Sequence, residues 1–94
     1  MSNFKFSLKL MKKLQPLLKE PIVLSFHAKT NGECSVAIHM TENNPEPAVL
    51  IVVRYCMDVY YYNSEKTHTT RCYNLTAILE NMHYYAPELF KEKK

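Results

Sequence analysis

Hydrophobic and polar residues alternate at the start of the chain. In NFKFSLKL, residues 3–10, the even positions from Phe4 to Leu10 are apolar and the residues between them are polar, a period typical of a strand. From Leu10 onward, leucine and methionine recur at helical spacing. We therefore expect a short strand that continues into a helix from about Ser7, which would cap it, to Gln15, because Pro16 ends a regular helix.

The segment PIVLSFHAKTNGECSVAIHM, residues 21–40, predicts a β-hairpin, because two alternating stretches flank Asn31-Gly32. A two-residue loop would set a row of apolar side chains opposite a row of polar ones. A three-residue loop over residues 30–32, with glycine in the left-handed conformation, pairs Phe26 with Val36 and gathers the apolar side chains on one face. Since a slip of one residue turns every side chain to the other face, we predict the three-residue bulged loop.

The third apolar segment is AVLIVVRYCMDVYYYN, residues 48–63, in which every odd position is apolar or aromatic up to Tyr61. The even positions are apolar only as far as Val52, which indicates a strand that starts in the core and leaves it at Arg54. Such a strand would span roughly 50 Å, so we expect a bulge or break near residues 56–58. Arg54 and Asp58 would lie about 13 Å apart along it and mark its exit from the core rather than a catalytic pair.

The remainder of the chain predicts a polar connection, SEKTHTTR, and then a helix from Leu75 to Met82 capped by Asn74. Pro87 would open a last helical turn, and residues 88–94 would form a basic tail. Together these elements predict a single α+β domain over residues 1–94. We expect a mainly antiparallel sheet of three to four strands with two helices packed on one face.

Composition narrows the classes of function. The chain has 94 residues, a net charge of +3 and one glycine, which excludes the glycine-rich phosphate loops of nucleotide-binding proteins. The start of the sequence is too charged for a secretory leader, and its longest apolar run is far shorter than a membrane helix. Three cysteines without a framework spacing favour reduced thiols. We therefore expect an intracellular protein, cytoplasmic or nuclear, with no membrane partner.

The histidines and cysteines give no metal site by spacing, since no C-x-x-C or H-x-x-x-H is present. In the predicted hairpin, His27 lies opposite Ser35 and His39 opposite Val23, about 13 Å apart along the strands, and Cys34 is on the other face. We expect no metal and no cofactor. An enzyme that uses Cys72, the thiol expected to be most exposed, is the third-ranked hypothesis, and we predict a protein that is not an enzyme.

Tyrosines and lysines carry the two leading hypotheses. Tyrosine suits protein interfaces because its ring is apolar and its tip polar, and the end of the third apolar segment is a candidate sheet edge. The predicted interface residues are Tyr55, Tyr60, Tyr61, Tyr62, Tyr84 and Tyr85. They predict a protein–protein interaction module, either a homodimer or a subunit of a larger assembly. The alternative is a small nucleic-acid-binding subunit that uses Lys5, Lys9, Lys12, Lys13, Lys29 and Arg54.

Two families show a similar layout. Residues 4–62 resemble the last half-domain of sliding clamps of the replication or checkpoint type, with FKFSLKLMKKL, IVLSF, LIVVRY and a tyrosine-rich edge strand DVYYYN in order. This resemblance implies a subunit of a DNA-encircling ring with paired edge strands. The order of helix, Asn-Gly hairpin, third strand and final helix also resembles the small α-β-β-β-α subunit of the signal recognition particle, which implies binding of Alu RNA through the sheet.

Overall fold

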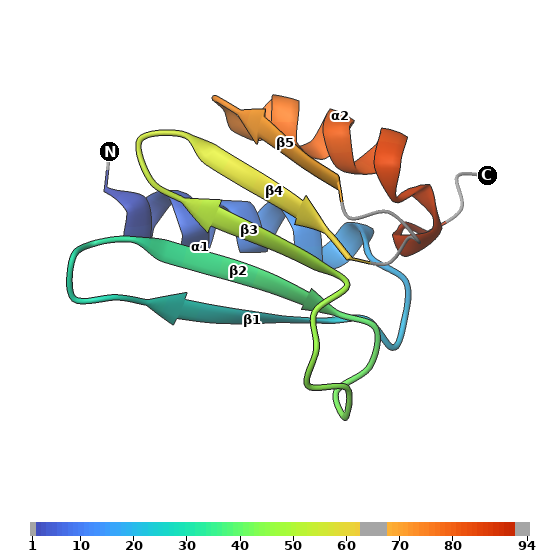
Figure 1. The fold of residues 1–94 in the computed structure, drawn as a ribbon. Coiled ribbons are helices and arrows are strands. Elements are labelled where there is room, and N and C mark those ends of the chain that lie inside the picture. Colours follow the sequence, from blue (N-terminus) through green and yellow to red (C-terminus); the bar gives the residue numbers. More distant parts are fainter. Residues whose placement is uncertain (1, 63–67, 92–94) are drawn as a thin grey trace.

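The computed structural model describes residues 2–62 and 68–91, which form two layers, a sheet and a pair of helices (Figure 1). The elements in chain order are α1 (Asn3–Leu14), a 3-10 turn η1 (Gln15–Leu17), β1 (Val23–Ala28), β2 (Cys34–His39), β3 (Val49–Val53), β4 (Met57–Tyr61), β5 (His68–Cys72), α2 (Leu75–Tyr85) and a 3-10 turn η2 (Pro87–Leu89). The strands form one antiparallel sheet of five strands in the order β1-β2-β3-β4-β5. The predicted α+β class is confirmed, with five strands where three to four were expected.

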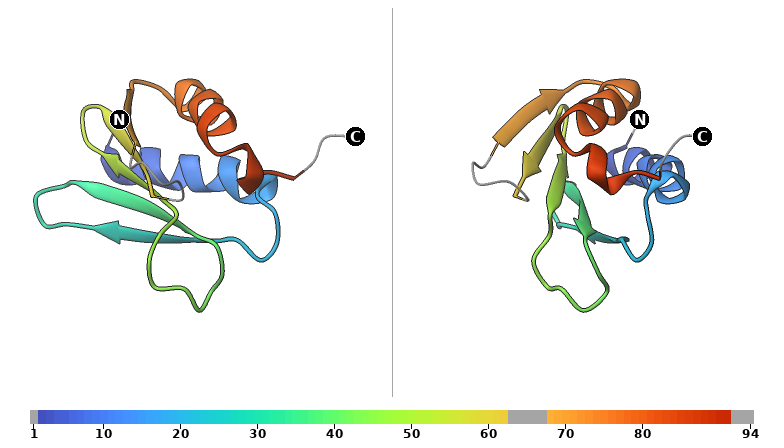
Figure 2. Two further views of the ribbon diagram at one scale, coloured as in Figure 1. Left: turned by 45° about the vertical axis from the view of Figure 1, so that its right-hand side comes forward. Right: turned by 90° about the vertical axis from the view of Figure 1, so that its right-hand side faces the viewer.

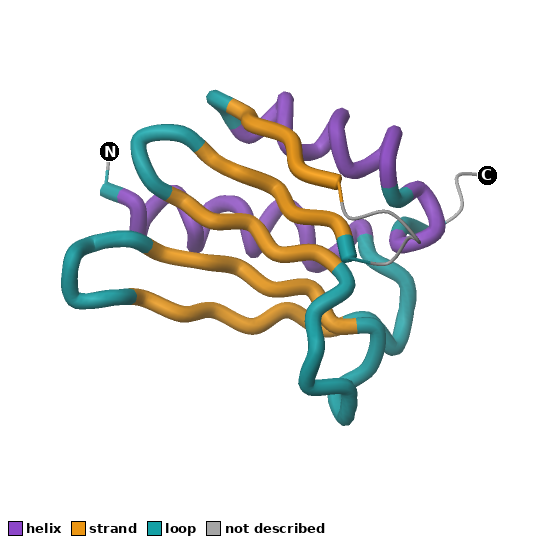
Figure 3. Tube along the Cα trace, viewed as in Figure 1, coloured by secondary structure: helices purple, strands orange, loops and turns teal. Residues whose placement is uncertain are grey.

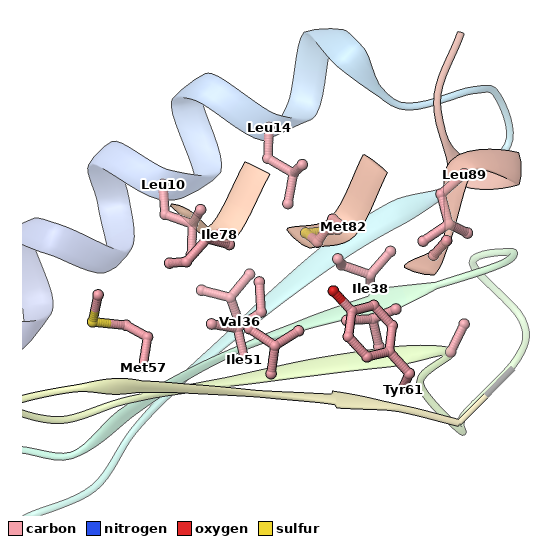
Figure 4. Close-up of a cluster of buried hydrophobic side chains, with 14 of the residues drawn as sticks. Leu10, Leu14, Val36, Ile38, Ile51, Met57, Tyr61, Ile78, Met82 and Leu89 are labelled. Carbon is pink, nitrogen blue, oxygen red and sulfur yellow. The ribbon is translucent and has the colours of Figure 1, made fainter. Parts of the chain in front are cut away.

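Both helices cover the same face of the sheet, as the end-on view in Figure 2 shows. Helix α1 packs on β1, β2 and β3, and α2 packs on β4 and β5. Between the layers, Leu10 and Leu14 of α1 meet Ile78 and Met82 of α2 above the inward side chains of the sheet (Figure 4). No helix of the described ranges lies over the other face (Figure 3).

The first element is a helix from its beginning, so the predicted strand at residues 4–10 is wrong. Ser2 caps the helix, since its hydroxyl accepts a hydrogen bond from the Lys5 N–H at 3.1 Å. Ser7, the predicted cap, is fully buried and donates its hydroxyl proton to the Asn3 carbonyl at 2.7 Å. The buried side of α1 consists of Ser7, Leu10 and Leu14, which recur at helical spacing. The alternation of apolar and polar residues along the sequence therefore does not correspond to the side that is buried. The predicted end of the regular helix before Pro16 is confirmed.

The β1–β2 hairpin has the predicted register. Phe26 pairs with Val36, His27 lies opposite Ser35 and His39 lies opposite Val23. Gly32 has φ of +90°, its N–H donates to the Lys29 carbonyl at 3.0 Å, and the Lys29 N–H donates to the Glu33 carbonyl at 2.8 Å. This is the three-residue loop with a left-handed glycine, and the hydrophobic pattern selected it correctly.

The segment 48–63 is two strands and not one. The chain reverses at residues 54–56, where the Arg54 N–H donates to the Cys56 carbonyl at 2.9 Å, and β4 returns beside β3 with Val53 opposite Met57. The expected break near residues 56–58 is therefore a complete hairpin. Its consequence is that Arg54 and Asp58, expected about 13 Å apart, form an ion pair.

Two further corrections concern the second half of the chain. Residues 68–71 of the predicted polar connection belong to β5, which ends at Cys72, while its residues 64–67 lie outside the described part. The predicted helix is present as Leu75–Tyr85, and its cap is confirmed because the Asn74 side chain accepts from the Ala77 N–H at 2.8 Å. The predicted tail 88–94 begins inside the fold, since Leu89 and Phe90 are buried and the Lys91 N–H donates to the Leu17 carbonyl at 2.9 Å.

Candidate interaction surface

Side chains that alternate along each strand give the sheet a covered face and a helix-free face, which we call the open face. The strand register places two rows of side chains across the open face. One row runs Ser25, Ala37, Leu50, Tyr60 and Thr69 from β1 to β5. The neighbouring row runs His27, Ser35, Val52, Asp58 and Arg71 in the same direction. The open face is therefore apolar at its centre, on β3 and β4, and polar toward both edges.

The centre of the open face combines aliphatic and aromatic side chains. Leu50, Val52 and Tyr60 are partly exposed, and Tyr62, just after β4, is 45% exposed. The rings of Tyr60 and Tyr62 stack with centroids 6.4 Å apart and planes 6° apart. Beside them is a shallow hollow of about 300 Å³ lined by Glu46, Pro47, Leu50 and Tyr62. The stacked rings and the hollow present an apolar surface with a defined shape.

A chain of ion pairs crosses one end of the same face and joins the two hairpin turns to β5. Lys29 Nζ lies 3.0 Å from a Glu33 carboxylate oxygen, and the other oxygen lies 3.6 Å from Arg54 Nε. Asp58 accepts hydrogen bonds from Arg54 and, at 2.9 Å, from Arg71 Nε. A smaller hollow of about 190 Å³ adjoins this end, and its lining consists of His27, Lys29, Glu33, Cys34, Ser35, Leu50 and Val52.

The carboxyl of Asp58 is buried, but the two arginines hold it in the charged form. The hydrogen bond from Arg71, and after it the one from Arg54, lower the pKa of Asp58 below its ordinary value although burial opposes this. In turn the hydrogen bond to Asp58 raises the pKa of Arg71. A carboxylate that is already paired with two cations is a poor general base or acid at neutral pH. The pair Arg54–Asp58 thus has a structural explanation.

The six tyrosines predicted as one interface lie on different parts of the molecule. Tyr60 and Tyr62 share the open face, but β4 lies between β3 and β5, so the expected sheet edge at this position is wrong. Tyr55 is 90% exposed in the turn at the other end of β4, and Tyr84 and Tyr85 lie on α2.

Tyr61 belongs to the core rather than to a surface. It is 2% exposed, and its hydroxyl donates to the Asn81 side-chain oxygen at 2.6 Å. Burial raises the pKa of the Tyr61 phenol above its ordinary value. A residue packed in this way cannot contact a partner while the fold is intact.

The basic residues predicted for nucleic-acid binding also separate. Lys5, Lys9, Lys12 and Lys13 are exposed on α1, on the helix side of the sheet. Lys29 and Arg54 lie at the end of the sheet and are paired with Glu33 and Asp58. The lysines of α1 and the two sheet cations thus lie on different parts of the molecule, and Lys29 and Arg54 share with Arg71 the two carboxylates of Glu33 and Asp58.

All three cysteines are free thiols and buried. Cys72, expected to be the most exposed, is 4% exposed and lies opposite Met57 on the covered face of the sheet, and burial raises its pKa. A raised pKa reduces the thiolate that a nucleophile requires. Within residues 2–62 and 68–91, no group of histidine, cysteine or acidic side chains is arranged to hold a metal ion. No helix in that part of the chain has the length and apolar character to cross a membrane.

Leu50 and Val52 are the surface residues that the sequence reasoning missed. The first half of the third apolar segment is apolar at odd and even positions alike, which predicts burial on both faces, whereas Leu50 and Val52 are partly exposed. The same pattern describes a strand with one covered face and one apolar face open to solvent. The signal in the sequence for this open face is that the even positions stop being apolar at Arg54.

Comparisons of the chain with family models, with curated proteins and with solved structures found no match. The element order also differs from both resemblances. A strand at residues 4–10 and an edge strand at 58–62, expected from the sliding-clamp layout, are a helix and an inner strand here. The Alu-RNA-binding layout has three strands between its helices, whereas this chain has five. The surface itself is therefore the basis for any statement about function.

Proposed function

We propose that this protein is a non-catalytic protein–protein interaction module that binds its partner through the open face of the sheet. The observation that carries the proposal is the apolar centre of that face, with Leu50, Val52 and the stacked rings of Tyr60 and Tyr62. An apolar cluster with a polar rim on an uncovered sheet is the usual composition of a recognition surface. The partner is a protein, either a second copy or another subunit of an assembly.

The rim of the open face supports binding with a fixed orientation. Thr69 and Ser25 lie at the two ends of the central row, and the ion-pair chain of Glu33, Arg54 and Asp58 closes one end. Polar groups at the rim contribute mainly to orientation, while apolar contacts at the centre contribute most of the affinity. Tyrosine supplies a large contact area with few rotatable bonds.

The chemistry of the titratable groups supports binding over catalysis. Asp58 has both arginines as partners, and the Cys72 thiol is buried with a raised pKa. Neither group combines exposure with the pKa that acid–base or nucleophilic catalysis requires.

Site-specific photo-crosslinking tests the proposal. A benzophenone amino acid is introduced in place of Tyr62 on the open face or, as the matched control, in place of Tyr84, which is 78% exposed on α2. We expect one dominant adduct from position 62 in cells that express the protein, and its loss when Tyr60 is changed to lysine. An adduct of twice the chain mass identifies a second copy, and any other defined mass identifies a different subunit. Adducts from position 84 alone would contradict the proposal.

Helix α1 supports a second candidate function, that of a small nucleic-acid-binding subunit. Its four lysines at 5, 9, 12 and 13 fall within an arc of roughly 100°, and none of the ion pairs in the described part of the chain uses them. A stripe of this kind can follow a phosphate backbone. Binding to labelled RNA or DNA whose affinity falls steeply with salt would favour this candidate over the apolar interface.

A further inference from the structure

Strand β1 forms one edge of the sheet, and no described residue bonds to its outward backbone groups. The Lys29 N–H is bonded to Glu33, and hydrogen-bonded pairs alternate along an antiparallel ladder. Residues 27, 25 and 23 therefore bond to β2, and the N–H and C=O groups of Leu24, Phe26 and Ala28 point away from the sheet. No bond to these groups is made by any other residue in the described ranges. Another strand in extended conformation would supply hydrogen-bond partners for these N–H and C=O groups.

The opposite edge differs in its side chains. Edge strand β5 carries Arg71, and charges on edge strands discourage pairing with other chains. Strand β1 reads VLSFHA and has no charged residue and no proline. Beside it on α1, Phe4 is 51% exposed and Leu8 is 42% exposed, and the Phe4 ring meets the Phe26 ring edge-on at 5.5 Å. The β1 edge thus combines unpaired backbone groups with an apolar flank.

We propose that β1 pairs with β1 of a second copy, antiparallel, about a two-fold axis at Ser25, and so extends the sheet across two molecules. In an antiparallel self-pairing, outward residues must meet outward residues, which restricts the axis to a residue position. An axis at Ser25 makes two hydrogen-bonded pairs of Leu24 with the second copy's Phe26. It sets Ser25 opposite Ser25 and Val23 opposite His27 on the open side.

The second copy brings an edge of the same kind to the pair. Its β1 also has no charged residue and no proline, so no like charges meet along the paired strands. Phe4 and Leu8 beside each β1 are large, apolar and exposed, and the two-fold axis brings both apolar flanks to the same face of the extended sheet. A partner identical to this chain therefore meets both the backbone groups and the apolar flank.

This inference does not rest on the proposed function, because it uses the sheet edge and leaves the apolar centre of the open face accessible. A pairing of six residues and an apolar flank is at the small end of specific interfaces, so we expect a dimer with a dissociation constant in the micromolar range. Photo-crosslinking at position 62 can fail while the dimer forms, and the dimer can be absent while crosslinking succeeds.

The test is a charge exchange at the two-fold axis, followed by sedimentation velocity over a range of concentrations. Ser25→Lys and Ser25→Glu each place like charges directly opposite one another, and we expect each to weaken the dimer at least about tenfold. An equimolar mixture of the two variants should restore dimerisation, because Lys then meets Glu. Ser25→Ala is the matched control, since it removes the hydroxyl that bonds to His39 without adding charge, and it should dimerise like the wild type.

Amide hydrogen exchange gives a second measurement on the unmodified chain. The N–H groups of Leu24 and Phe26 should exchange at least about tenfold more slowly at concentrations where the dimer predominates, whereas the amides of β5 should not change. A wild type that stays monomeric at all concentrations would overturn the inference. So would a dimer that tolerates both single charges, or exchange at Leu24 and Phe26 that is independent of concentration.

Discussion

The two faces of the sheet are formed by the same five strands, yet they differ in what covers them. Neighbours on β3 illustrate the difference, since Ile51 is fully buried under the helices and Leu50 is partly exposed on the open face. Both are large aliphatic residues. Burial in the core explains why Ile51 is apolar, whereas no helix in the described part of the molecule lies over Leu50. The contrast separates residues that stabilise the fold from residues available for binding.

The largest expected effect comes from truncating these two neighbours. Ile51→Ala leaves a cavity among well-packed side chains and should lower the free energy of unfolding by about 2–5 kcal/mol. Leu50→Ala should lower it by about 1–2 kcal/mol, because part of its side chain is already in water. Urea unfolding followed by circular dichroism measures both. Equal losses for the two variants would contradict the assignment of a covered face and an open face.

Asp58 is the exception to this contrast, because it is a buried charge on the open face. Asp58→Asn keeps the shape but weakens the hydrogen bonds from Arg54 and Arg71, and we expect a loss of about 1 kcal/mol at pH 7, since both arginines are half in solvent. The pKa of Asp58 is lower in the folded state than its ordinary value of 3.8. Its contribution to stability is therefore present above the unfolded pKa and is lost as the pH falls through the folded one.

The measurement for Asp58 is the unfolding free energy of the wild type and Asp58→Asn from pH 7 down to pH 2. The difference between the two proteins should be constant near neutral pH and shrink on acidification below about pH 4. Ser35→Ala is a suitable control from the same row of the open face, and its difference from the wild type should not change with pH. A gap between wild type and Asp58→Asn that widens on acidification would have the wrong sign for a carboxylate held by arginines.

The smallest expected effect on stability is at the aromatic pair. Tyr60→Lys combined with Tyr62→Lys removes the stacked rings from the open face and should change the free energy of unfolding by less than about 1 kcal/mol. The same double variant should lose binding to whatever partner the crosslinking identifies. Tyr84→Lys, with the same chemical change on α2, should keep that binding. Retained binding in the double variant together with loss in Tyr84→Lys would move the interaction surface to the helix.

Sequence patterns predicted the β1–β2 hairpin to the residue because two signals agreed there. Asn31-Gly32 requires a turn, and only one register gathers the apolar side chains on one face. The reversal at residues 54–56 gave no such signal. It contains no glycine, asparagine or proline, and among the described residues only Gly32 has a positive φ, so ordinary residues make this turn without strain. The hydrophobic pattern alone therefore predicts one strand where the structure has β3 and β4.

Strand β5 was missed for a different reason. Its residues are polar because one side faces solvent and the other includes Thr70, which donates to Asn81 of α2 at 2.6 Å. At the N-terminus, alternation suggested a strand because Ser7 is polar, and only its hydrogen bond to Asn3 shows why a serine suits the buried side of α1. Polar residues can belong to an edge strand, and a serine can lie on the buried side of a helix when its hydroxyl bonds to the backbone. A prediction from hydrophobic periodicity misses both cases.

The sequence by itself determined the α+β class, the register of the first hairpin, the cap at Asn74 and the end of α1 before Pro16, because these features depend on neighbours along the chain. The tertiary structure alone decided that Arg54 meets Asp58, that Tyr61 is core while Tyr60 and Tyr62 are surface, and that β1 is an uncharged edge. These depend on which strands lie side by side and which face the helices cover. Local periodicity gives a side chain its face, but only the packed layers determine whether that face meets protein or water.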